Sequence, residues 1–442
     1  MNCEILKTLY VRSNGDIPCH DDAGSTILLG QVPSGNPKWD VMSVLGNSQY
    51  QRLRGELGQG RAPWMGTCSR CALLREHEDF SDNLTQKSIK TVQIEPSLAC
   101  NLSCLCCSQP GEIHVRPKPF LLPLPIFNTI LASLRRNQFH VGEIEYCGQG
   151  EPLMHPSFPS LVETARGHFP SACQRLITNG NFDYWKATRG VALDEIFVSC
   201  DGFFPESYVK YRVGGDVRLP LQFLRDVPHE AGGRRQTIIW KYILFEFNDT
   251  DREIRAAQAA ANDLGVDLLL FVFTTTQYKS KRYGLANGAD FPVYCPNVVT
   301  SATPTIQRQC RQATPTGTNR FEHSEAMSVL DEVAVLGNGK LWVRGWALTR
   351  GPLERIEVEL DGELLGCARR GLARPDVHRA YPQYDNRYSG FEFAEARNVA
   401  SGTHRIGIRL VRAAMGAVHF ARDFRFPSEL NHAATFNVTG GV

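Results

Sequence analysis

Three cysteines on one short segment are the residues of this chain best suited to redox chemistry. Cys100, Cys104 and Cys107 have the spacing C-x3-C-x2-C and follow closely on an apolar run that ends at Ile94. Thiolates are the preferred ligands of iron–sulfur clusters. Three of them can hold three irons of a cubane [4Fe–4S] cluster and leave the fourth iron open. An open iron can bind a small molecule and give it an electron, so the segment predicts a redox cluster with one free coordination site.

Zinc, or ordinary buried thiols, are the alternatives for these cysteines. A closed structural zinc site normally has four ligands, and Cys106 could be the fourth. Four later segments favour the cluster because they match the resemblance described next, and the first three of them follow predicted strands. They are Gly148-Gln149-Gly150-Glu151-Pro152, Thr178-Asn179-Gly180, Ser199-Cys200-Asp201-Gly202 and Tyr211-Arg212-Val213-Gly214-Gly215. Glycines there let backbone groups approach a ligand closely.

The cysteine segment and these four later segments resemble, in the same order, the motifs of radical S-adenosylmethionine (radical SAM) enzymes. The resemblance implies that the three cysteines ligate the cluster. It also implies a site for S-adenosylmethionine (SAM). In that site the methionine amino group of SAM is received by Gly148, Gln149, Gly150 and Glu151. The ribose is lined by Asn179, Ser199 and Asp201, and the carboxylate faces Arg212. A simple turn and a solvated surface arginine are the alternatives for Gly148–Pro152 and for Arg212. Cys147 and Cys200 are interpreted as buried thiols.

The mechanism that the resemblance implies is reductive cleavage of SAM. The cluster would pass one electron to the sulfonium, and the resulting 5′-deoxyadenosyl radical would abstract a hydrogen atom from a substrate. A reducing partner such as flavodoxin or ferredoxin is implied as well. The protein would position the reactants and exclude water, while the cofactors carry the difficult chemistry.

Four further cysteines precede this segment, namely Cys3, Cys19, Cys68 and Cys71. Their spacing also fits a loose zinc ribbon. Their surroundings, at 9–19, 27–32, 48–54 and 68–71, resemble the SPASM/twitch auxiliary-cluster domain, although that domain normally follows the barrel. The resemblance implies a second, auxiliary [4Fe–4S] cluster with every iron ligated, whose natural role is electron transfer. Cys295 and Cys310, which follow the last predicted strand, could be remnants of such a domain or ligands of another centre, but we interpret them as buried thiols.

The elements that must position these residues alternate between strand and helix. Six apolar strands are predicted at Thr91–Ile94, Glu143–Tyr146, Leu176–Thr178, Glu195–Ser199, Ile238–Phe245 and Asp267–Phe273. Helical patterns between them imply a parallel sheet. Six units are too few to close an eight-stranded barrel, so we expect an α/β fold with a partial (βα)6 TIM-like barrel and chemistry at the C-terminal strand ends. One helix is expected to begin at Pro125, and another to have Asp249 as N-cap and to end at Gly265.

The last hundred residues change to strict alternation. Ile356, Val358 and Leu360 alternate with glutamates, and Asp361-Gly362 is a hairpin signal. We expect a small antiparallel β-sandwich. It resembles a module of bacterial proteins of glycan and cell-surface assembly. Trp342 and Trp346 could stack on sugar or belong to the core. The predicted domains are a SPASM-like domain at 1–78, the radical SAM barrel at 88–325 and the sandwich at 326–430.

The composition of the chain argues against several classes of function. The 442 residues carry a net charge of +2, which indicates no nucleic-acid or membrane electrostatics. We find no apolar run long enough to span a membrane and no signal-peptide pattern. We therefore expect a cytoplasmic location, where the 14 cysteines stay reduced. The favoured function is a radical SAM oxidoreductase or modifying enzyme acting on a sugar, a glycan precursor or a peptide. The alternative is a binding protein, zinc-stabilised or with a degenerate barrel, that acts in glycan or cell-surface assembly through its sandwich.

Overall fold

The computed structural model divides the chain into two compact units. Unit 1 comprises residues 1–223 and 231–239, and unit 2 comprises residues 224–230 and 240–442. The structure describes residues 1–19, 27–68, 71, 73–75, 80–285, 288–295, 297–302, 305–312, 314–315, 320–336, 340–372, 374–386, 388–397, 399–413, 416–426 and 431–437. In these ranges, no helix combines the length and the apolar character that crossing a membrane requires.

Unit 1 contains a parallel sheet whose strand ends gather at one edge. Its successive strands are β6 (Ser88–Ile94), β7 (His140–Tyr146), β8 (Cys173–Thr178) and β9 (Glu195–Ser199). Ile94 pairs with Tyr146, Tyr146 with Leu176, and Thr178 with Val198, so the C-terminal ends lie together. These strands form because their apolar residues, such as Val92, Ile144 and Ile196, are fully buried. Four of the six predicted strands are thereby confirmed.

A further strand comes from the N-terminal, cysteine-containing region. β2 (Thr8–Val11) pairs in parallel with β6, in the register that puts Val11 opposite Ile94. The sequence suggested only a SPASM-like segment here. Because β2 is parallel to β6, the residues that follow it lie at the same sheet edge as the segment that carries Cys100.

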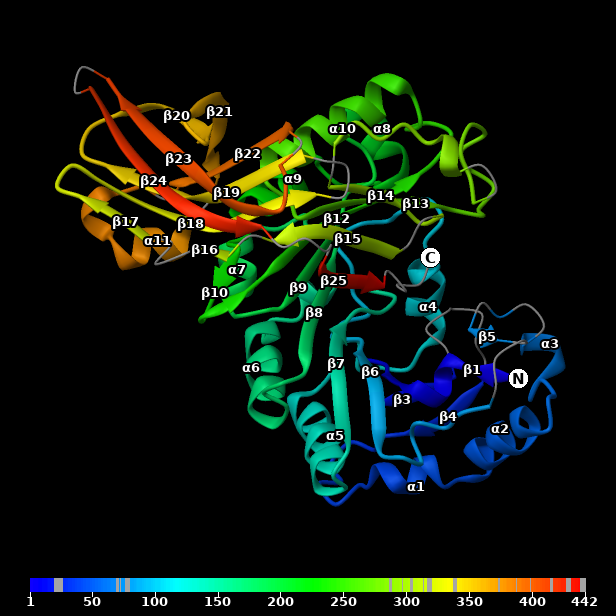
Figure 1. Cartoon of the computed structure of the whole chain (residues 1–442). Helices are drawn as coiled ribbons and strands as arrows, with labels where there is room; N and C mark the ends of the chain where they lie inside the picture. The colour runs from blue at the N-terminus through cyan, green and yellow to red at the C-terminus, as the bar shows by residue number, and fades with distance from the viewer. Residues whose placement is uncertain are drawn as a thin grey trace. The chain divides into compact units, whose positions relative to one another are not determined.

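Helices connect these strands in the expected alternation. α5 (Leu124–Arg136) precedes β7 and α6 (Phe158–His168) follows it, and Figure 1 shows both beside β7 and β8. Pro125 lies in the first turn of α5, as predicted, and Ile126, Ile130 and Leu134 are buried. The other helical elements of this part are α4 (Gln109–Val115), η2 (Pro152–Met154), α7 (Tyr184–Thr188) and α8 (Pro205–Tyr211).

The N-terminal cysteines lie among short elements of unit 1. β1 (Asn2–Cys3) pairs antiparallel with β5 (Leu74–Arg75), which brings the two ends of this region together. The remaining elements are η1 (Glu4–Lys7), β3 (Asp16–Pro18), β4 (Leu28–Gln31), α1 (Val41–Leu45), α2 (Ser48–Gly58) and α3 (Met65–Cys68). Asn47 caps α2 by accepting hydrogen bonds from the backbone N–H groups of Gln49 and Tyr50.

Three elements run across the boundary of the units, namely α9 (Arg218–Asp226), the short β10 (Glu230–Ala231) and β12 (Thr237–Leu244), and β11 (Arg234–Arg235) lies between the last two. Unit 2 continues with α10 (Asp251–Leu264), β13 (Leu268–Phe273), η3 (Gly288–Asp290) and β14 (Val298–Thr300). β12 and β13 confirm the last two predicted strands, and β14 pairs in parallel with β13. Gly265 ends α10 with φ +70°, as predicted. The predicted N-cap is wrong by one residue. Thr250 caps α10, because the carboxylate of Asp249 instead accepts the Ser280 hydroxyl at 2.7 Å.

The C-terminal strands of unit 2 form an antiparallel sheet in the order β16-β24-β23-β20-β21-β22-β19-β18-β15-β25, with β17 paired to β18. Their bounds are β15 (Thr305–Gln312), β16 (Thr314–Pro315), β17 (Arg320–His323), β18 (Ala326–Leu336), β19 (Lys340–Thr349), β20 (Leu353–Leu360), β21 (Glu363–Leu372), β22 (Gly390–Ala396), β23 (Gly402–Arg412), β24 (Gly416–Phe426) and β25 (Asn431–Asn437). The antiparallel pairing is confirmed, but the strands follow one continuous order where two separate sheets were expected.

The interior of this sheet explains its sequence pattern. Ile356, Val358, Phe391 and Ile406 belong to one buried apolar cluster. Asp361 and Gly362 have φ +52° and +84° between β20 and β21, so the hairpin prediction is confirmed. Trp342 and Trp346 are buried, 5% and 6% exposed, which favours the core interpretation over sugar stacking. The short α11 (Pro375–Ala380) and η4 (Pro382–Tyr384) interrupt the strands, although no helix was predicted there.

Candidate functional site

The segment with Cys100, Cys104 and Cys107 leaves the C-terminal end of β6. The backbone N–H of Leu102 donates to the Cys100 sulfur at 3.5 Å, and that of Gln109 donates to the Cys107 sulfur at 3.4 Å. Burial raises the pKa of Cys100 to about 11, and the negative charges of Glu151, Cys104 and Cys107 add to this shift. The charges of Cys104 and Cys107 therefore act on Cys100, which shows that the three thiols lie near one another.

Arg212 links two of the predicted site segments. Its Nη1 donates to the Cys104 sulfur at 3.6 Å, and its Nε and Nη2 contact Asp201 Oδ2 at 2.6 and 2.5 Å. The Asp201 side chain is fully buried, so the ion pair is shielded from water. Burial raises the pKa of Cys104, while the Arg212 cation acts in the opposite direction. The interpretation of Arg212 as a solvated surface residue is wrong.

Glu151 ties the ends of β7 and β8 to the cysteine segment. Its carboxylate accepts hydrogen bonds from the Thr178 hydroxyl at 2.6 Å and from the backbone N–H groups of Asn179 at 2.8 Å and Leu153 at 3.1 Å. Its own N–H donates to the Ala99 carbonyl at 2.9 Å. Burial raises the pKa of Glu151, and the hydrogen bonds oppose that shift. Both carboxylate oxygens are thus engaged by the chain itself.

Two further predicted residues lie at neighbouring strand ends. Asn179 Nδ2 donates to Asn101 Oδ1 at 2.8 Å and lies 3.9 Å from the Cys100 sulfur. Ser199 is the last residue of β9 and is buried. Asn179 is therefore in contact with the cysteine segment, and Ser199 lies two residues before the Asp201 that pairs with Arg212.

Glycines in Gly148–Pro152 are required by packing within the chain. A Cβ atom at Gly148 would lie 2.3 Å from Glu95 Cγ, and one at Gly150 would lie 2.3 Å from the Ser97 carbonyl oxygen. Between them, the Gln149 N–H donates to Glu95 Oε2 at 3.0 Å, and its side chain accepts the Ser108 hydroxyl at 2.6 Å. From the sequence we expect these glycines to allow close approach to a ligand. The close approach in the structure is to the segment that carries the cysteines.

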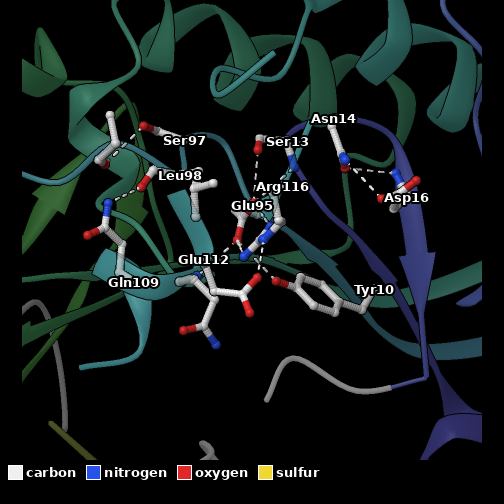
Figure 2. Close-up of polar contacts among 12 residues, drawn as sticks. Tyr10, Ser13, Asn14, Asp16, Glu95, Ser97, Leu98, Gln109, Glu112 and Arg116 are labelled. Carbon is white, nitrogen blue, oxygen red and sulfur yellow. Dashed lines mark hydrogen bonds and ion pairs between the residues drawn. The ribbon is translucent and has the colours of Figure 1, made fainter. Parts of the chain in front are cut away.

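A buried carboxylate at the end of β6 is the main site feature that the sequence argument missed. Figure 2 shows Glu95 surrounded by donors: Arg116 Nη1 at 2.7 Å, Arg116 Nη2 at 3.2 Å, the Ser13 hydroxyl at 2.9 Å, the Ser13 N–H at 3.1 Å and the Tyr10 hydroxyl at 3.3 Å. Arg116 also pairs with Glu112 of α4. We call Glu95, Arg116, Glu112, Tyr10 and Ser13 the Glu95 network. A charged residue between an apolar strand and Pro96 was the signal in the sequence.

The four N-terminal cysteines also interact with one another. Burial raises the pKa of Cys3 to about 12, with Cys71 and Cys68 adding to the shift, and burial together with the other three thiols raises the pKa of Cys19. The Cys71 N–H donates to the Cys68 carbonyl at 3.1 Å, and the Leu73 N–H donates to the Cys71 sulfur at 3.4 Å. The four thiols therefore lie within electrostatic range of one another, although they are far apart in the sequence.

The remaining cysteines have other surroundings. Cys200 is fully buried and its thiol donates to the Gly202 carbonyl at 3.3 Å, whereas Cys147 is only partly buried. Cys295 is partly buried and donates to the Gln258 carbonyl at 3.6 Å. The side chain of Cys310 lies outside the described residues. Cys106 is exposed, as is Cys107, whereas Cys100 and Cys104 are partly buried, so exposure does not decide whether Cys106 is a ligand.

The donor chemistry of both cysteine groups fits iron–sulfur clusters. Backbone N–H groups donate to the sulfur atoms of Cys100 and Cys107 in one group and of Cys71 in the other, and such hydrogen bonds tune cluster potentials. Among the described residues, no three His, Cys, Asp or Glu side chains are arranged to hold a single metal ion. Zinc at the four-cysteine group stays an alternative.

Comparison with known proteins gives relatives for part of the chain. No family model matches. A stretch of 141 residues, 31% of the chain, is 28% identical to the "Probable GTP 3',8-cyclase" of Methanococcus aeolicus and covers 45% of that protein. The protein of the same name from Methanococcus maripaludis is 29% identical over 133 residues, which are 30% of the chain and 43% of that protein. The chain thus spans less than half the length of these curated relatives.

Among solved structures, a radical SAM methyltransferase from Sphaerobacter thermophilus is 14% identical, with a TM-score of 0.31 over 41% of this chain and 55% of that chain. The similarity to radical SAM enzymes rests on the sequence relatives and on the site, and the solved structure adds nothing to it. In the site, the three-cysteine segment lies with Glu151, Asn179, Asp201 and Arg212 at one end of the parallel strands. The chain is therefore similar to radical SAM enzymes over the part that these relatives cover, about a third of its length.

Proposed function

We propose that Cys100, Cys104 and Cys107 hold a [4Fe–4S] cluster beside a bound SAM, and that the enzyme modifies its substrate by hydrogen-atom abstraction. The bound cofactors would supply a 5′-deoxyadenosyl radical by reductive cleavage of SAM. The observation that carries the proposal is the bridge that Arg212 makes between the Cys104 sulfur and Asp201. It joins a cysteine of the predicted cluster to a residue of the predicted SAM site.

The chain's own residues would orient and shield the reactants. Arg212 is the cation next to the cysteines, so it suits both the thiolates and the carboxylate of SAM. Asp201 holds that guanidinium in place from a fully buried position. Glu151 accepts three hydrogen bonds from its own chain, so we assign it to fixing the ends of β7 and β8, with the Gly148–Gly150 backbone left for the methionine amino group.

We further propose that Cys3, Cys19, Cys68 and Cys71 hold an auxiliary [4Fe–4S] cluster. A cluster with four cysteine ligands has no open iron, so its role would be to accept the second electron of a two-electron oxidation. The mutual pKa shifts of these thiols support a common site. The proposal includes a reducing partner such as flavodoxin or ferredoxin, a reducing cytoplasmic location, and a sugar, glycan precursor or peptide as substrate.

Anaerobic reconstitution with iron and sulfide tests both clusters. The wild type should bind about eight irons per chain. Cys104→Ser should bind about four and lose SAM cleavage, whereas Cys68→Ser should bind about four and still cleave SAM. Cys367→Ser is the matched control, because this exposed cysteine in β21 belongs to neither group, and it should behave as the wild type.

The outcomes separate the two proposals. SAM cleavage by Cys104→Ser at the wild-type rate would contradict the first. Four irons in the wild type, together with stoichiometric zinc that Cys68→Ser removes, would contradict the second and favour a zinc-stabilised N-terminal region. Zinc in both cysteine groups, with no iron, would instead favour the binding-protein alternative.

A further inference from the structure

A cavity of about 340 Å³ lies in the C-terminal sheet of unit 2. It is bordered by the end of β19, the start of β20, the end of β21 and the segment before β22. Its lining is part apolar and part polar, and the residues used below are Thr349, Arg370, Tyr384, Asn386, Tyr388 and Ser389. We call it the β19–β21 cavity. All of its lining residues lie within unit 2, and none is a candidate ligand of the proposed clusters.

Ser389 is the first indication that the cavity is a binding site. Its side chain is almost completely buried, 4% exposed, and its hydroxyl oxygen has no hydrogen-bond partner among the described residues. Buried hydroxyl groups in folded proteins nearly always have a partner, because leaving one without a partner is unfavourable. A ligand atom in the cavity would supply the missing hydrogen bond.

The aromatic and amide groups of the lining are held in place by local structure. Tyr388 is 45% exposed, which is unusual for a large aromatic side chain, and Tyr384 is half-buried beside it in the lining. The Tyr388 N–H donates to Asn386 Oδ1 at 2.9 Å, which fixes the Asn386 side chain and leaves its amide N–H groups for another acceptor. Gly351 and Gly371 turn the chain at the rim with φ +86° and +87°.

We propose that the β19–β21 cavity binds a single sugar residue that carries a carboxylate. A sugar ring has C–H faces that pack on tyrosine rings and a rim of hydroxyl groups that exchange hydrogen bonds with Ser389 and Asn386. Arg370 is the one charged side chain in the lining, and an exposed guanidinium pairs well with a carboxylate. The volume is at the lower end of the ~300–1,000 Å³ range of small-molecule sites, which suits a ligand of one or two rings.

Titration calorimetry on the full-length protein tests the proposal, with glucuronate, glucose and acetate as probes. We expect saturable binding of glucuronate, at least tenfold weaker binding of glucose, and no binding of acetate. Ser389→Ala and Tyr388→Ala should each weaken glucuronate binding at least tenfold. Ser389→Ala should keep or raise the melting temperature, because it removes the buried hydroxyl without a partner. Arg370→Gln should abolish the preference for glucuronate over glucose.

Leu364→Ala is the control, since Leu364 is exposed on the same β21 strand and does not line the cavity. It should bind glucuronate as the wild type does. Absence of saturable binding of both sugars by the wild type would overturn the proposal. So would unchanged affinity in both Ser389→Ala and Tyr388→Ala, or acetate binding as tight as that of glucuronate. A preference for glucuronate that survives Arg370→Gln would overturn the assignment of the carboxylate to Arg370.

Discussion

The Glu95 network contributes to the free energy of unfolding because its ionised groups are buried. The side chains of Glu95 and Arg116 are 0% and 5% exposed. A buried charge is tolerated only when a partner and hydrogen bonds replace water, so removal of one partner leaves the other at a high free energy. The same carboxylate holds the Gln149 N–H and the Ser13 hydroxyl. One pair therefore supports both the Gly148–Pro152 segment and the chain after β2.

Arg116→Gln is the first prediction. It should lower the free energy of unfolding by about 3–5 kcal/mol, because it leaves the Glu95 carboxylate buried without its cation. It should also reduce the iron retained at Cys100, Cys104 and Cys107 after gel filtration. The control is Arg61→Gln, which breaks the exposed pair of Arg61 and Glu56 and should cost about 0–1 kcal/mol. Equal urea midpoints for the two variants would contradict the prediction.

His155 gives a second prediction, on the dependence of stability on pH. Its ring is buried beside the Leu122 carbonyl, 2.9 Å from Nε2, and Nδ1 accepts the Ser157 N–H at 3.2 Å. These bonds suit the neutral ring, and burial lowers the pKa of His155 below the ordinary 6.5. As the pH falls below about 6.5, the unfolded chain takes up a proton that the folded chain does not, so stability is lost down to the folded pKa.

Urea midpoints at a series of pH values between 7.5 and 5 check this prediction. His155→Gln should lose less stability over this range than the wild type does. His140→Gln, at an exposed position on β7, should keep the wild-type slope. An identical slope for His155→Gln and the wild type would refute the assignment.

At the scale of the elements, the contact between Gly148–Pro152 and the cysteine segment leaves no room for side chains. In Gly150→Ala the new Cβ would meet the Ser97 carbonyl oxygen at 2.3 Å and the Leu98 carbonyl carbon at 2.4 Å. Backbone atoms cannot move aside without displacing the cysteine segment. We expect a loss of about 1–3 kcal/mol in unfolding free energy together with weaker iron binding.

Gly167→Ala is the matched control for this third prediction. Gly167 lies in α6 with no atom within 4 Å of the added Cβ. This variant should be stabilised by about 0.4–1 kcal/mol, because alanine reduces the freedom of the unfolded chain. The melting temperature and the bound iron of Gly150→Ala and Gly167→Ala check this prediction. Equal values for the two variants would exclude a steric clash at Gly150.

Local patterns in the sequence predicted most helices and strands. The features that were predicted wrongly or not at all depend on contacts between residues far apart in the sequence. The six strands and the end of α10 at Gly265 follow from periodicity and from glycine's access to positive φ. The N-cap of α10 was misplaced because Ser280, 31 residues from Asp249, takes up that carboxylate. The pairing of β2 with β6 was missed since no local pattern specifies a parallel partner so far away.

The candidate site was predictable as a set of residues but not as a set of contacts. The order of the motifs indicated Cys104, Asp201 and Arg212, and the structure joins them. It did not indicate that the Glu151 carboxylate accepts hydrogen bonds from Thr178, Asn179 and Leu153. These partners come within reach of Glu151 only when strands β7 and β8 pair.

At the scale of the whole molecule, the seven candidate cluster ligands all lie in unit 1, whereas the antiparallel sheet lies in unit 2. Phe391→Ala, which empties a fully buried position of that sheet, should destabilise it by about 3–5 kcal/mol. Iron bound per folded chain should stay at the wild-type value. Leu364→Ala should change neither quantity, and a loss of iron in Phe391→Ala at a temperature below its melting transition would contradict this fourth prediction.

The parallel pairing of β2 with β6 has a consequence for biosynthesis. Ser13 and its acceptor Glu95 are 82 residues apart, so a chain leaving the ribosome exposes β2 long before its partner exists. Cys3 and Cys19 likewise emerge well ahead of Cys68 and Cys71. During that interval they are accessible thiols, open to oxidation and to stray metal ions. If these cysteines hold the proposed auxiliary cluster, its insertion has to wait for later translation, and slow synthesis in air should lower the yield of the N-terminal site before that of any other part.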